Sequence, residues 1–334
     1  MMYAYGKMPK KIKWLEKASH LLIVSGILCV LAGCASESQH SSYPPNASQA
    51  SRGEQRTFAT PEQAVEALVT ATRENRRDDL LKILGPDAHQ IIYSGDKVAD
   101  QEGRDRFVSA YDRAHEIRSD DAGHDTLVVG EEEWPLPIPL VHAENGWTFD
   151  TAAGQEEILN RRIGRNELNV LEVCRVYVEA QQEFSALHAN GKRHHEYAQH
   201  FQSSPDQHDG LYWPAADGQP ISPLGPFLAS AAEEGYSGKV FSKRTPYHGY
   251  YYRILKSQGA HASGGAKDYI VDGHMRRGFA LIAFPARYDD SGVMTFIVNQ
   301  DGIVYEKNLG FDTAEIASIT REFDPDDSWN IVRQ

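Results

Sequence analysis

Residues 138–151 read IPLVHAENGWTFDT, and this stretch decides which fold the N-terminal half can form. Two runs rich in apolar and aromatic side chains, Ile138 to Ala143 and Trp147 to Thr151, flank Glu144-Asn145-Gly146. Asn-Gly is the strongest short signal for a tight hairpin, because both residues accept the positive φ angles of the turn. The stretch therefore predicts two antiparallel strands, and Thr126 to Val129 predicts a further strand before them.

Three helices are predicted upstream of these strands. Thr60-Pro61-Glu62-Gln63 combines an N-cap residue with proline at the first helical position and Gln at the capping-box position. A second helix is expected from Asp78 to Leu84, where Gly85-Pro86 ends it, and a third over about 104–118. Three leading helices followed by a twisted antiparallel sheet resemble, in pattern only, the NTF2-like or cystatin-like superfamily. The acidic run Glu131-Glu132-Glu133 is interpreted as a charged guard on an edge strand.

A long helix is predicted after Gly164, with Asn190-Gly191 as its C-terminal stop. Its apolar residues recur three and four positions apart, which places them in one stripe: Val170, Val173, Tyr177, Ala180, Phe184 and Leu187. The section from Gln202 to Gly249 is rich in Pro, Gly and Ser and has little periodicity.

Four antiparallel strands are predicted next, and they are Gly249 to Lys256, Gly278 to Pro285, Ser291 to Asn299 and Ile303 to Lys307. Asp301-Gly302 predicts a tight hairpin between the last two strands. A short helix containing Ile316 and Ile319 is expected to cover a sheet edge. A long helix followed by a four-stranded meander resembles the soluble head of type IV pilins and type II secretion pseudopilins. The predicted fold class is therefore α+β, in two domains (57–162 and 163–334) that each pack helices on a twisted antiparallel sheet.

The first 33 residues are typical of a secretory leader. Lysines precede the uncharged apolar run from Leu21 to Gly33, which is shorter than the roughly 20 residues needed to span a membrane. The end of this run, Leu31-Ala32-Gly33-Cys34, resembles the bacterial lipobox, which implies that Cys34 becomes the lipidated first residue of the mature protein. Ala35, in place of Asp, implies sorting to the outer membrane, facing the periplasm. The alternatives are an ordinary signal peptide or a short buried N-terminal helix.

Residues 34–56 are predicted to be a disordered tether, because they contain few apolar side chains. Of the three cysteines, Cys29 leaves with the leader and Cys34 carries lipid. Only Cys174 remains, so no intramolecular disulfide can form in the mature chain, and its apolar helical surroundings predict an inert buried thiol. Lys plus Arg number 34 against 47 Asp plus Glu, a formal charge of −13, which argues against nucleic acid as a partner.

Several strings in the mature chain are distinctive. They are FDTAAG at 149–154, RRIGRNEL at 161–168, DGLYWP at 209–214, PYHGYYY at 246–252 and GVMTF at 292–296. On these strings, the segment from about Phe58 to Trp329 resembles a bacterial exported-protein family known as domain of unknown function 2950. The resemblance implies export and a two-part architecture, and it assigns no catalytic residue and no substrate.

One aromatic cluster is a candidate ligand contact. Strand alternation places Tyr250 and Tyr252 on one face and Tyr251 and Arg253 on the other. Core packing is the simpler interpretation, and an aromatic platform for sugar rings or peptide is the functional one. The residues proposed for such a platform are Tyr212, Trp213, Tyr247, His248, Tyr250 and Tyr251.

Other motifs do not carry a site. His195 and His200 are five positions apart, so a helix would separate them, whereas a zinc-binding pair needs a spacing of four. Ser94-Gly95-Asp96-Lys97 matches the acyl-serine pattern Ser-x-x-Lys, but its partner signatures are absent, and Gly95 with Asp96 favours a turn over a helix start. The acidic residues Asp324, Asp326 and Asp327 are followed by too little chain for a calcium loop. No catalytic residue, metal or cofactor is therefore predicted.

The sequence predicts an exported envelope lipoprotein that acts as a non-catalytic binding or assembly module. Its expected partners are the lipid bilayer, through the acylated N-terminus, and an envelope protein or polysaccharide. The alternative is a hydrolase or ligand-binding protein that acts on envelope polymers through a pocket in the first domain. The apolar character of Val128, Ile138, Leu140 and Phe149 on the strands of that domain disfavours an enzyme. A third possibility is a folding or sensor module that holds an apolar ligand.

Overall fold

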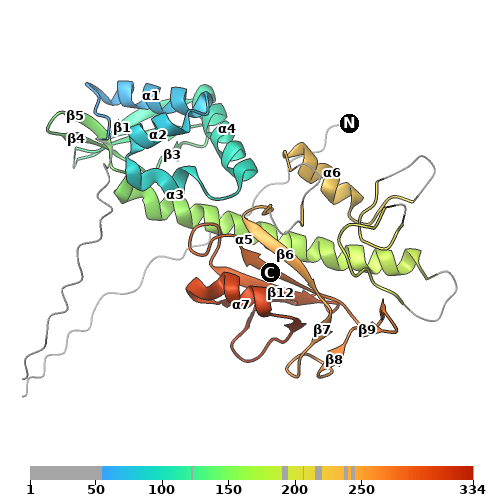
Figure 1. Ribbon diagram of the computed structural model, residues 1–334. Helices are drawn as coiled ribbons and strands as arrows, with labels where there is room; N and C mark the ends of the chain where they lie inside the picture. The colour runs from blue at the N-terminus through green and yellow to red at the C-terminus, as the bar shows by residue number, and fades with distance from the viewer. Residues whose placement is uncertain are drawn as a thin grey trace, which may run out of the picture. The chain divides into compact units, whose positions relative to one another are not determined.

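A computed structural model describes residues 55–121, 123–189, 195–205, 207–214, 220–236, 240–241 and 245–333 (Figure 1). The predicted leader, Cys34 and nearly all of the predicted tether lie outside the described residues. Helices and antiparallel sheets alternate along the chain, which confirms the α+β class. None of the helices in the described ranges has the length and apolar character to cross a membrane.

The first two N-terminal helices are confirmed, with the predicted cap at Thr60 and the predicted stop at Gly85. The helical segments here are α1 (Pro61–Arg73), α2 (Arg77–Leu84), the 3-10 turn η1 (Pro86–Ala88), α3 (His89–Ile92) and α4 (Lys97–Arg113). The Thr60 hydroxyl accepts from the Gln63 amide at 3.3 Å, as an N-cap does. Gly85 follows α2 with a φ of +88°, which confirms the predicted stop.

A five-stranded antiparallel sheet follows these helices. Its strands are β1 (His115–Ser119), β2 (Asp125–Val129), β3 (Trp134–Pro135), β4 (Leu140–Ala143) and β5 (Gly146–Phe149), in the order β1-β2-β4-β5 with β3 beside β2. The hairpin at Glu144-Asn145 is confirmed, because Ala143 pairs with Gly146 and Leu140 with Phe149. Both Leu140 and Phe149 are fully buried, so the hairpin faces the core.

Two predictions in this half are wrong. The third helix lies at 97–113 rather than 104–118, because the Asp96 side chain accepts from the Val98 and Ala99 amides and starts the helix early. Ile117 belongs to β1, where it pairs with Leu127 of β2, a long-range contact that helical periodicity cannot reveal. The acidic run Glu131–Glu133 lies in the turn between β2 and β3 and guards no strand edge.

The helix α5 runs from Thr151 to Leu187 and begins well before the predicted start at Gly164. Its N-cap is Asp150, whose carboxylate accepts from the Ala153 amide at 3.2 Å. The predicted boundary between residues 162 and 163 lies inside this helix. The predicted stop at Asn190-Gly191 lies outside the described residues.

The predicted meander forms the main sheet of the C-terminal half. Strands β6 (Tyr250–Leu255), β11 (Ala280–Pro285), β12 (Met294–Asn299) and β13 (Val304–Asn308) are antiparallel neighbours, with β15 (Asn330–Ile331) beyond β13. Two smaller sheets contain β7 (Ser257–Gln258), β8 (Lys267–Asp268), β9 (Ile270–Val271), β10 (His274–Met275) and β14 (Glu322–Phe323).

Two helical segments of this half differ from expectation. The helix α6 (Gly225–Glu233) lies in the section that has little periodicity. The predicted short helix is confirmed as α7 (Thr313–Ile319), which follows the 3-10 turn η2 (Gly310–Asp312). It packs on β11, which is an interior strand of the sheet and not an edge strand. It buries Ala317, whereas Ile316 and Ile319 are exposed, because a residue as small as alanine lets the helix approach the strands closely.

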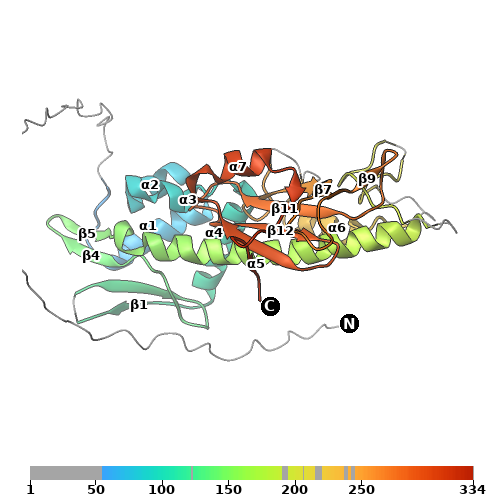
Figure 2. The same ribbon diagram turned by 90° about the horizontal axis from the view of Figure 1, so that it is seen from below.

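Two hydrophobic clusters form the cores of the two halves. One contains α1, α2 and the first sheet, and the other contains the meander and the predicted α5 stripe, of which Leu187 alone is exposed. Residues of α5 contact both clusters, since Ile158 packs against the first and Val170 belongs to the second. Both ribbon views show α5 passing the cyan helices and then the orange and red strands (Figure 2). A single helix therefore links the two cores.

Candidate functional site

A cavity of about 570 Å³ lies between α4, α5 and the core of the N-terminal half. Apolar side chains from that core form much of its wall, and they include Leu68, Leu80, Leu84, Ile92, Phe107, Leu136 and Ile138. Glu234 and His248 of the C-terminal half also line it. Its volume lies within the range of small-molecule sites, which combine an apolar wall with a few polar groups.

One face of α4 borders the cavity, and Gly103 lies at the centre of that face. Ala99, Gly103 and Arg106 follow the helical spacing, and Asp100 and Phe107 flank them. A Cβ atom at Gly103 would have no heavy atom within 4 Å. The absent side chain therefore contributes to the space on this side of the cavity.

Five arginines line the cavity: Arg104, Arg106, Arg161, Arg162 and Arg165. Three of them have close acidic partners, Arg106 with Glu102, Arg161 with Glu157 and Arg162 with Asp290, all at 2.6 Å. Within the described residues, no ion pair within 4.0 Å is found for Arg104 or Arg165. The cavity therefore has a concentration of positive charge that its own carboxylates do not fully pair.

Arg104 is the most buried of these arginines, with only 9% of its surface exposed. Its Nη2 donates to Gln101 at 3.2 Å, but its buried Nε has no hydrogen-bond partner among the described residues. Nη1 of Arg161 is buried and unpartnered in the same sense, although its Nε is paired. Buried donors are nearly always satisfied, so these two atoms are unusual, and each belongs to an arginine that lines the cavity.

The pKa values of Arg104 and Arg165 reflect their burial and the neighbouring arginines. Burial lowers the pKa of Arg104, and the nearby Arg77 lowers it further, while Asp100 partly opposes the shift. Burial also lowers the pKa of Arg165, with a further contribution from Arg106. Both guanidinium groups stay charged, because their ordinary pKa is far above neutrality. An anion in the cavity would relieve this repulsion.

Asp100 is a further carboxylate that lines the cavity. Both of its oxygens accept from the Ser94 amide at 3.2 Å. Burial raises the pKa of the Asp100 carboxyl, and the hydrogen bonds from Ser94 oppose that shift. The carboxylate is therefore held by the turn before α4.

His248 and Glu234 of the C-terminal half form an acid–base pair that also lines the cavity. His248 Nε2 lies 3.1 Å from a Glu234 oxygen, and the imidazole is 15% exposed. Its backbone has a φ of +47°, a left-handed conformation that is unusual for a residue other than glycine. Burial lowers the pKa of His248, and the Glu234 carboxylate opposes the shift.

Asp96 attaches this pair to the N-terminal half. Its carboxylate accepts from the Tyr236 hydroxyl at 2.8 Å and from the Gly249 amide at 3.0 Å, and it also caps α4. Asp96 is 3% exposed. One carboxylate thus joins the start of α4 to the turn that carries His248.

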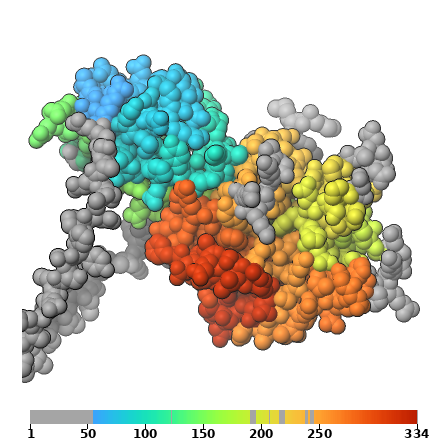
Figure 3. Space-filling model, in the orientation of Figure 1, coloured from blue at the N-terminus to red at the C-terminus, as the bar shows by residue number. Residues whose placement is uncertain are grey.

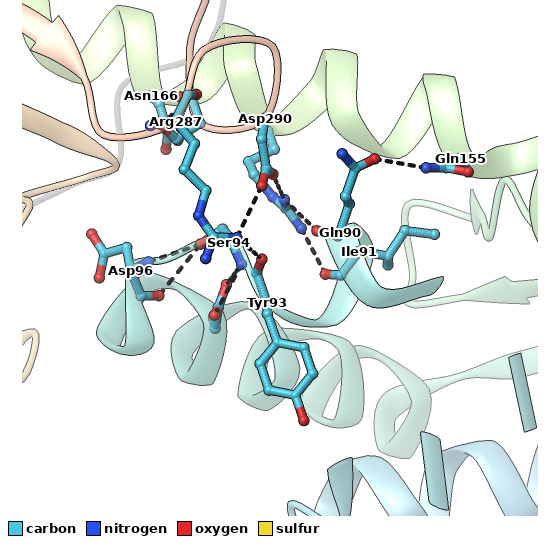
Figure 4. A network of polar contacts seen from close by, with 12 residues as sticks. Gln90, Ile91, Tyr93, Ser94, Asp96, Gln155, Asn166, Arg287 and Asp290 are labelled. Carbon is cyan, nitrogen blue, oxygen red and sulfur yellow. Dashed lines mark hydrogen bonds and ion pairs between the residues drawn. The ribbon is translucent and has the colours of Figure 1, made fainter. Parts of the chain in front are cut away.

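Two arginines connect the halves, and Figure 4 shows one of them, Arg287, with Asp290 and Tyr93. Arg162 of α5 binds Asp290 at 2.6 Å and donates to the Gln90 and Ile91 carbonyls at 2.8 and 2.6 Å. Arg287 donates to the Tyr93 carbonyl at 3.0 Å. In the space-filling view the cyan surface of the N-terminal half meets the orange surface of the C-terminal half (Figure 3). These contacts hold α3 against the loop after β11.

The structure places the six aromatic-cluster candidates at different depths. Trp213, Tyr247 and Tyr250 are buried, and Tyr212, His248 and Tyr251 are half-buried. The Tyr250 hydroxyl donates to the Met294 carbonyl at 2.9 Å, and Trp213 stacks on His208 with ring centres 4.3 Å apart. The predicted alternation is confirmed, since Tyr250 and Tyr252 are the buried pair. Of the six, His248 lines the cavity.

The remaining motifs are placed as follows. Cys174 is buried, which confirms the predicted burial, and burial raises the pKa of its thiol to about 12. The turn at Ser94-Gly95 is present, but the prediction that no helix starts there is wrong, because Asp96 caps α4 at Lys97. In the described ranges no group of three His, Cys, Asp or Glu residues could hold a metal ion.

The arginine cluster was not predicted from the sequence. Arg161, Arg162 and Arg165 lie in the distinctive string at 161–168. Arg104 and Arg106 lie on α4, much earlier in the chain. A useful signal was the spacing of Arg161 and Arg165, four apart on a helix in an acidic chain. Only the packing of α4 beside α5 brings the two groups together.

Fold and site together define an α+β protein with a cation-lined, partly apolar cavity between α4, α5 and its N-terminal core. A family model with the description "Protein of unknown function (DUF2950)" matches residues 55–332. The chain belongs to this family, as its distinctive strings imply. Comparison with curated proteins finds no match. Comparison with solved structures also finds none.

Proposed function

We propose that this chain is an exported, lipid-anchored binding module and that the cavity between α4 and α5 is its ligand site. The observation that carries the proposal is the cavity itself, a ligand-sized space with an apolar wall and convergent polar groups. The scaffold around it is well packed, with Leu140 and Phe149 fully buried. A protein that binds a ligand without reacting with it needs no more than this arrangement.

Binding can be tested with an uncharged apolar fluorophore, N-phenyl-1-naphthylamine. The dye is expected to brighten on binding the mature chain, since its emission rises in an apolar site. Gly103→Phe should abolish the signal, because the new ring would occupy space next to the cavity. Gly164→Phe is the matched control, since a Cβ at Gly164 also meets no atom within 4 Å but Gly164 does not line the cavity. Equal binding by wild type and Gly103→Phe would contradict the proposal.

The anchor is proposed from the leader and Cys34. Acylation of Cys34 would attach the chain to the outer membrane, facing the periplasm, because each buried CH₂ contributes about 0.8 kcal/mol to membrane binding. Cys34→Ser is expected to remove the protein from the membrane fraction or leave it unprocessed. Mass spectrometry of the mature N-terminus checks the site of attachment. A mature product that starts at another residue would refute this part of the proposal.

A hydrolase is the second candidate, and the His248–Glu234 pair favours it. A neutral imidazole held by a carboxylate at a cavity wall suits a general base. The substrate would be an envelope polymer or one of its esters. Hydrolysis of p-nitrophenyl esters of increasing chain length tests this function, with His248→Gln as the variant. Turnover that is lost in His248→Gln supports the hydrolase, and no turnover with any ester rejects it for this substrate class.

The finer fold resemblances belong to the same proposal. The four helices α1–α4 on the sheet β1-β2-β4-β5 support an NTF2-like or cystatin-like N-terminal half. The long helix α5 and the meander β6-β11-β12-β13 support a pilin-head-like C-terminal half. Partners of such a half would be envelope proteins or polysaccharides, which co-purification from solubilised envelopes can identify.

A further inference from the structure

We infer that the ligand of the cavity is an amphiphile with an apolar chain and an anionic headgroup, a carboxylate or a phosphate ester. The inference rests on the proposed binding function and names the ligand class. Two features of the cavity carry it: the apolar wall, and five lining arginines of which Arg104 and Arg165 have no acidic partner within 4.0 Å among the described residues.

The apolar wall accounts for the chain of the ligand. Leu68, Leu80, Leu84 and Ile138 are among the side chains that form it, and each belongs to the N-terminal core. Gly103 on α4 contributes open space on this side. An alkyl chain in this space would exchange water for hydrocarbon contacts, which favours binding.

The arginines account for the headgroup. Nε of Arg104 and Nη1 of Arg161 come from different helices, α4 and α5, and both are buried without an acceptor among the described residues. Arg165, also on α5, lies near Arg106 and Arg162, whose charges Glu102 partly offsets. A carboxylate or phosphate in the cavity would accept charged hydrogen bonds from this cluster of guanidinium groups, which bind such anions in a planar, two-pronged geometry.

The cavity carboxylates do not supply this acceptor. Glu102 is paired with Arg106 at 2.6 Å, and Asp100 is bound by the Ser94 amide. Glu234 is paired with His248 at 3.1 Å, on the C-terminal side of the cavity. An external anion would therefore balance arginine charge that the carboxylates of the described residues leave unpaired. A cationic headgroup would instead meet uncompensated arginines.

The experiment is a calorimetric titration of the mature chain with four probes below their aggregation concentrations. They are decanoate, decyl phosphate, decanol and decyltrimethylammonium, with inorganic phosphate as the headgroup alone. Decanoate and decyl phosphate should bind about tenfold or more tightly than decanol, because a charged hydrogen bond contributes about 1.5–3 kcal/mol. Decyltrimethylammonium should bind most weakly, and inorganic phosphate should bind more weakly than decyl phosphate.

Arg104→Met should remove the preference for decanoate over decanol while leaving decanol affinity within about twofold, because methionine keeps much of the apolar stem. Arg161→Met gives a second measurement in case Arg104→Met does not fold. Arg175→Met is the matched control, since Arg175 also lies on α5, has only exposed partners and does not line the cavity. Its affinities should equal those of the wild type.

The outcomes separate the two proposals. If decanol binds and Gly103→Phe abolishes that binding, but decanoate gains nothing over decanol, the cavity is a ligand site and the anionic headgroup is wrong. If Arg104→Met and Arg161→Met both still bind decanoate more tightly than decanol, the assignment of the headgroup to these arginines is wrong. If no probe and no dye binds, the proposed binding function itself fails.

Discussion

The contact between Arg162 and Asp290 shows how single residues join the two halves. Asp290 is 5% exposed and the Arg162 side chain 14%, so the pair is largely removed from water. Arg287 lies 3.4 Å from the other Asp290 oxygen. A buried ion pair has a large desolvation cost, and the loss of one partner leaves an uncompensated charge.

Asp290→Ala is expected to destabilise the protein by about 3 kcal/mol, because Arg162 would remain buried without its carboxylate. Arg162→Met should cost a similar amount, and the double variant should cost less than the sum of the two. Denaturant unfolding measures all three. Arg175→Ala, at an exposed ion pair, is the control and should change stability by less than about 1 kcal/mol. Additive effects in the double variant would show that the pair is not coupled.

His248 gives a prediction in pH. Its folded-state pKa lies below the ordinary value of 6.5, so the unfolded chain takes up the proton first as the pH falls. The contribution of this group to stability is therefore complete above the ordinary value and declines as the pH falls from there through the lowered pKa. Denaturation measured from pH 8 to pH 5 should show this decline in the wild type, and His248→Gln should lack it.

Glu234→Gln sharpens the same measurement. The Glu234 carboxylate favours the protonated imidazole, so its removal should lower the pKa of His248 further. The decline of stability should then extend to lower pH than in the wild type. A pH profile of His248→Gln identical to that of the wild type would contradict the account of this group.

At the scale of elements, two glycines in helices have opposite surroundings. Gly103 in α4 has open space where a Cβ would lie, whereas a Cβ at Gly154 in α5 would meet the Pro137 carbonyl oxygen at 2.5 Å. The first glycine leaves room at the cavity. The second allows the first turn of α5 to approach the chain before β4.

Gly103→Ala should stabilise the protein by about 0.5–1 kcal/mol, because alanine is the better helix former and meets no neighbour. Gly154→Ala should destabilise it by about 1–3 kcal/mol, because the methyl group would collide with backbone atoms that cannot rotate away. Thermal and denaturant unfolding of the two variants test the contrast directly. A loss of stability in Gly103→Ala would show that the cavity does not contain the space described.

The boundaries of α4 and α5 show how far element prediction reaches. The amphipathic stripe of α5 is present, yet the helix starts at Thr151 because Asp150 caps it, a signal hidden inside a run that also suits a strand. Ile117 has strand pairing because Leu127 lies opposite it. Local periodicity indicates the type of an element, while its ends depend on single capping residues and on partners distant in the sequence.

For the whole molecule, the long helix α5 contacts both cores. Ile158 packs against the N-terminal core and Val170 belongs to the C-terminal one. The contacts of Arg162, Arg287 and Asp96 add polar links between the halves. We therefore expect the described part of the chain to unfold in one cooperative transition.

Gly164→Pro tests this coupling, because Gly164 is an exposed position of α5 between the two cores. Proline there removes a helical hydrogen bond and should cost about 3 kcal/mol. Hydrogen exchange should then show the two cores opening separately, whereas Gly164→Ala should keep a single transition. Separate opening already in the wild type would refute the proposed coupling.

The sequence by itself determined the α+β class, the hairpin at Asn145-Gly146, the meander and the family, since these depend on local patterns and on distinctive strings. It also determined that Tyr250 and Tyr252 share one face of a strand, because strand alternation needs no tertiary information, whereas packing decided that this face is the buried one. The tertiary structure alone decided the cavity. Arg104 and Arg161 come from separate helices, and a site built across α4 and α5 exists only after long-range packing brings their side chains together.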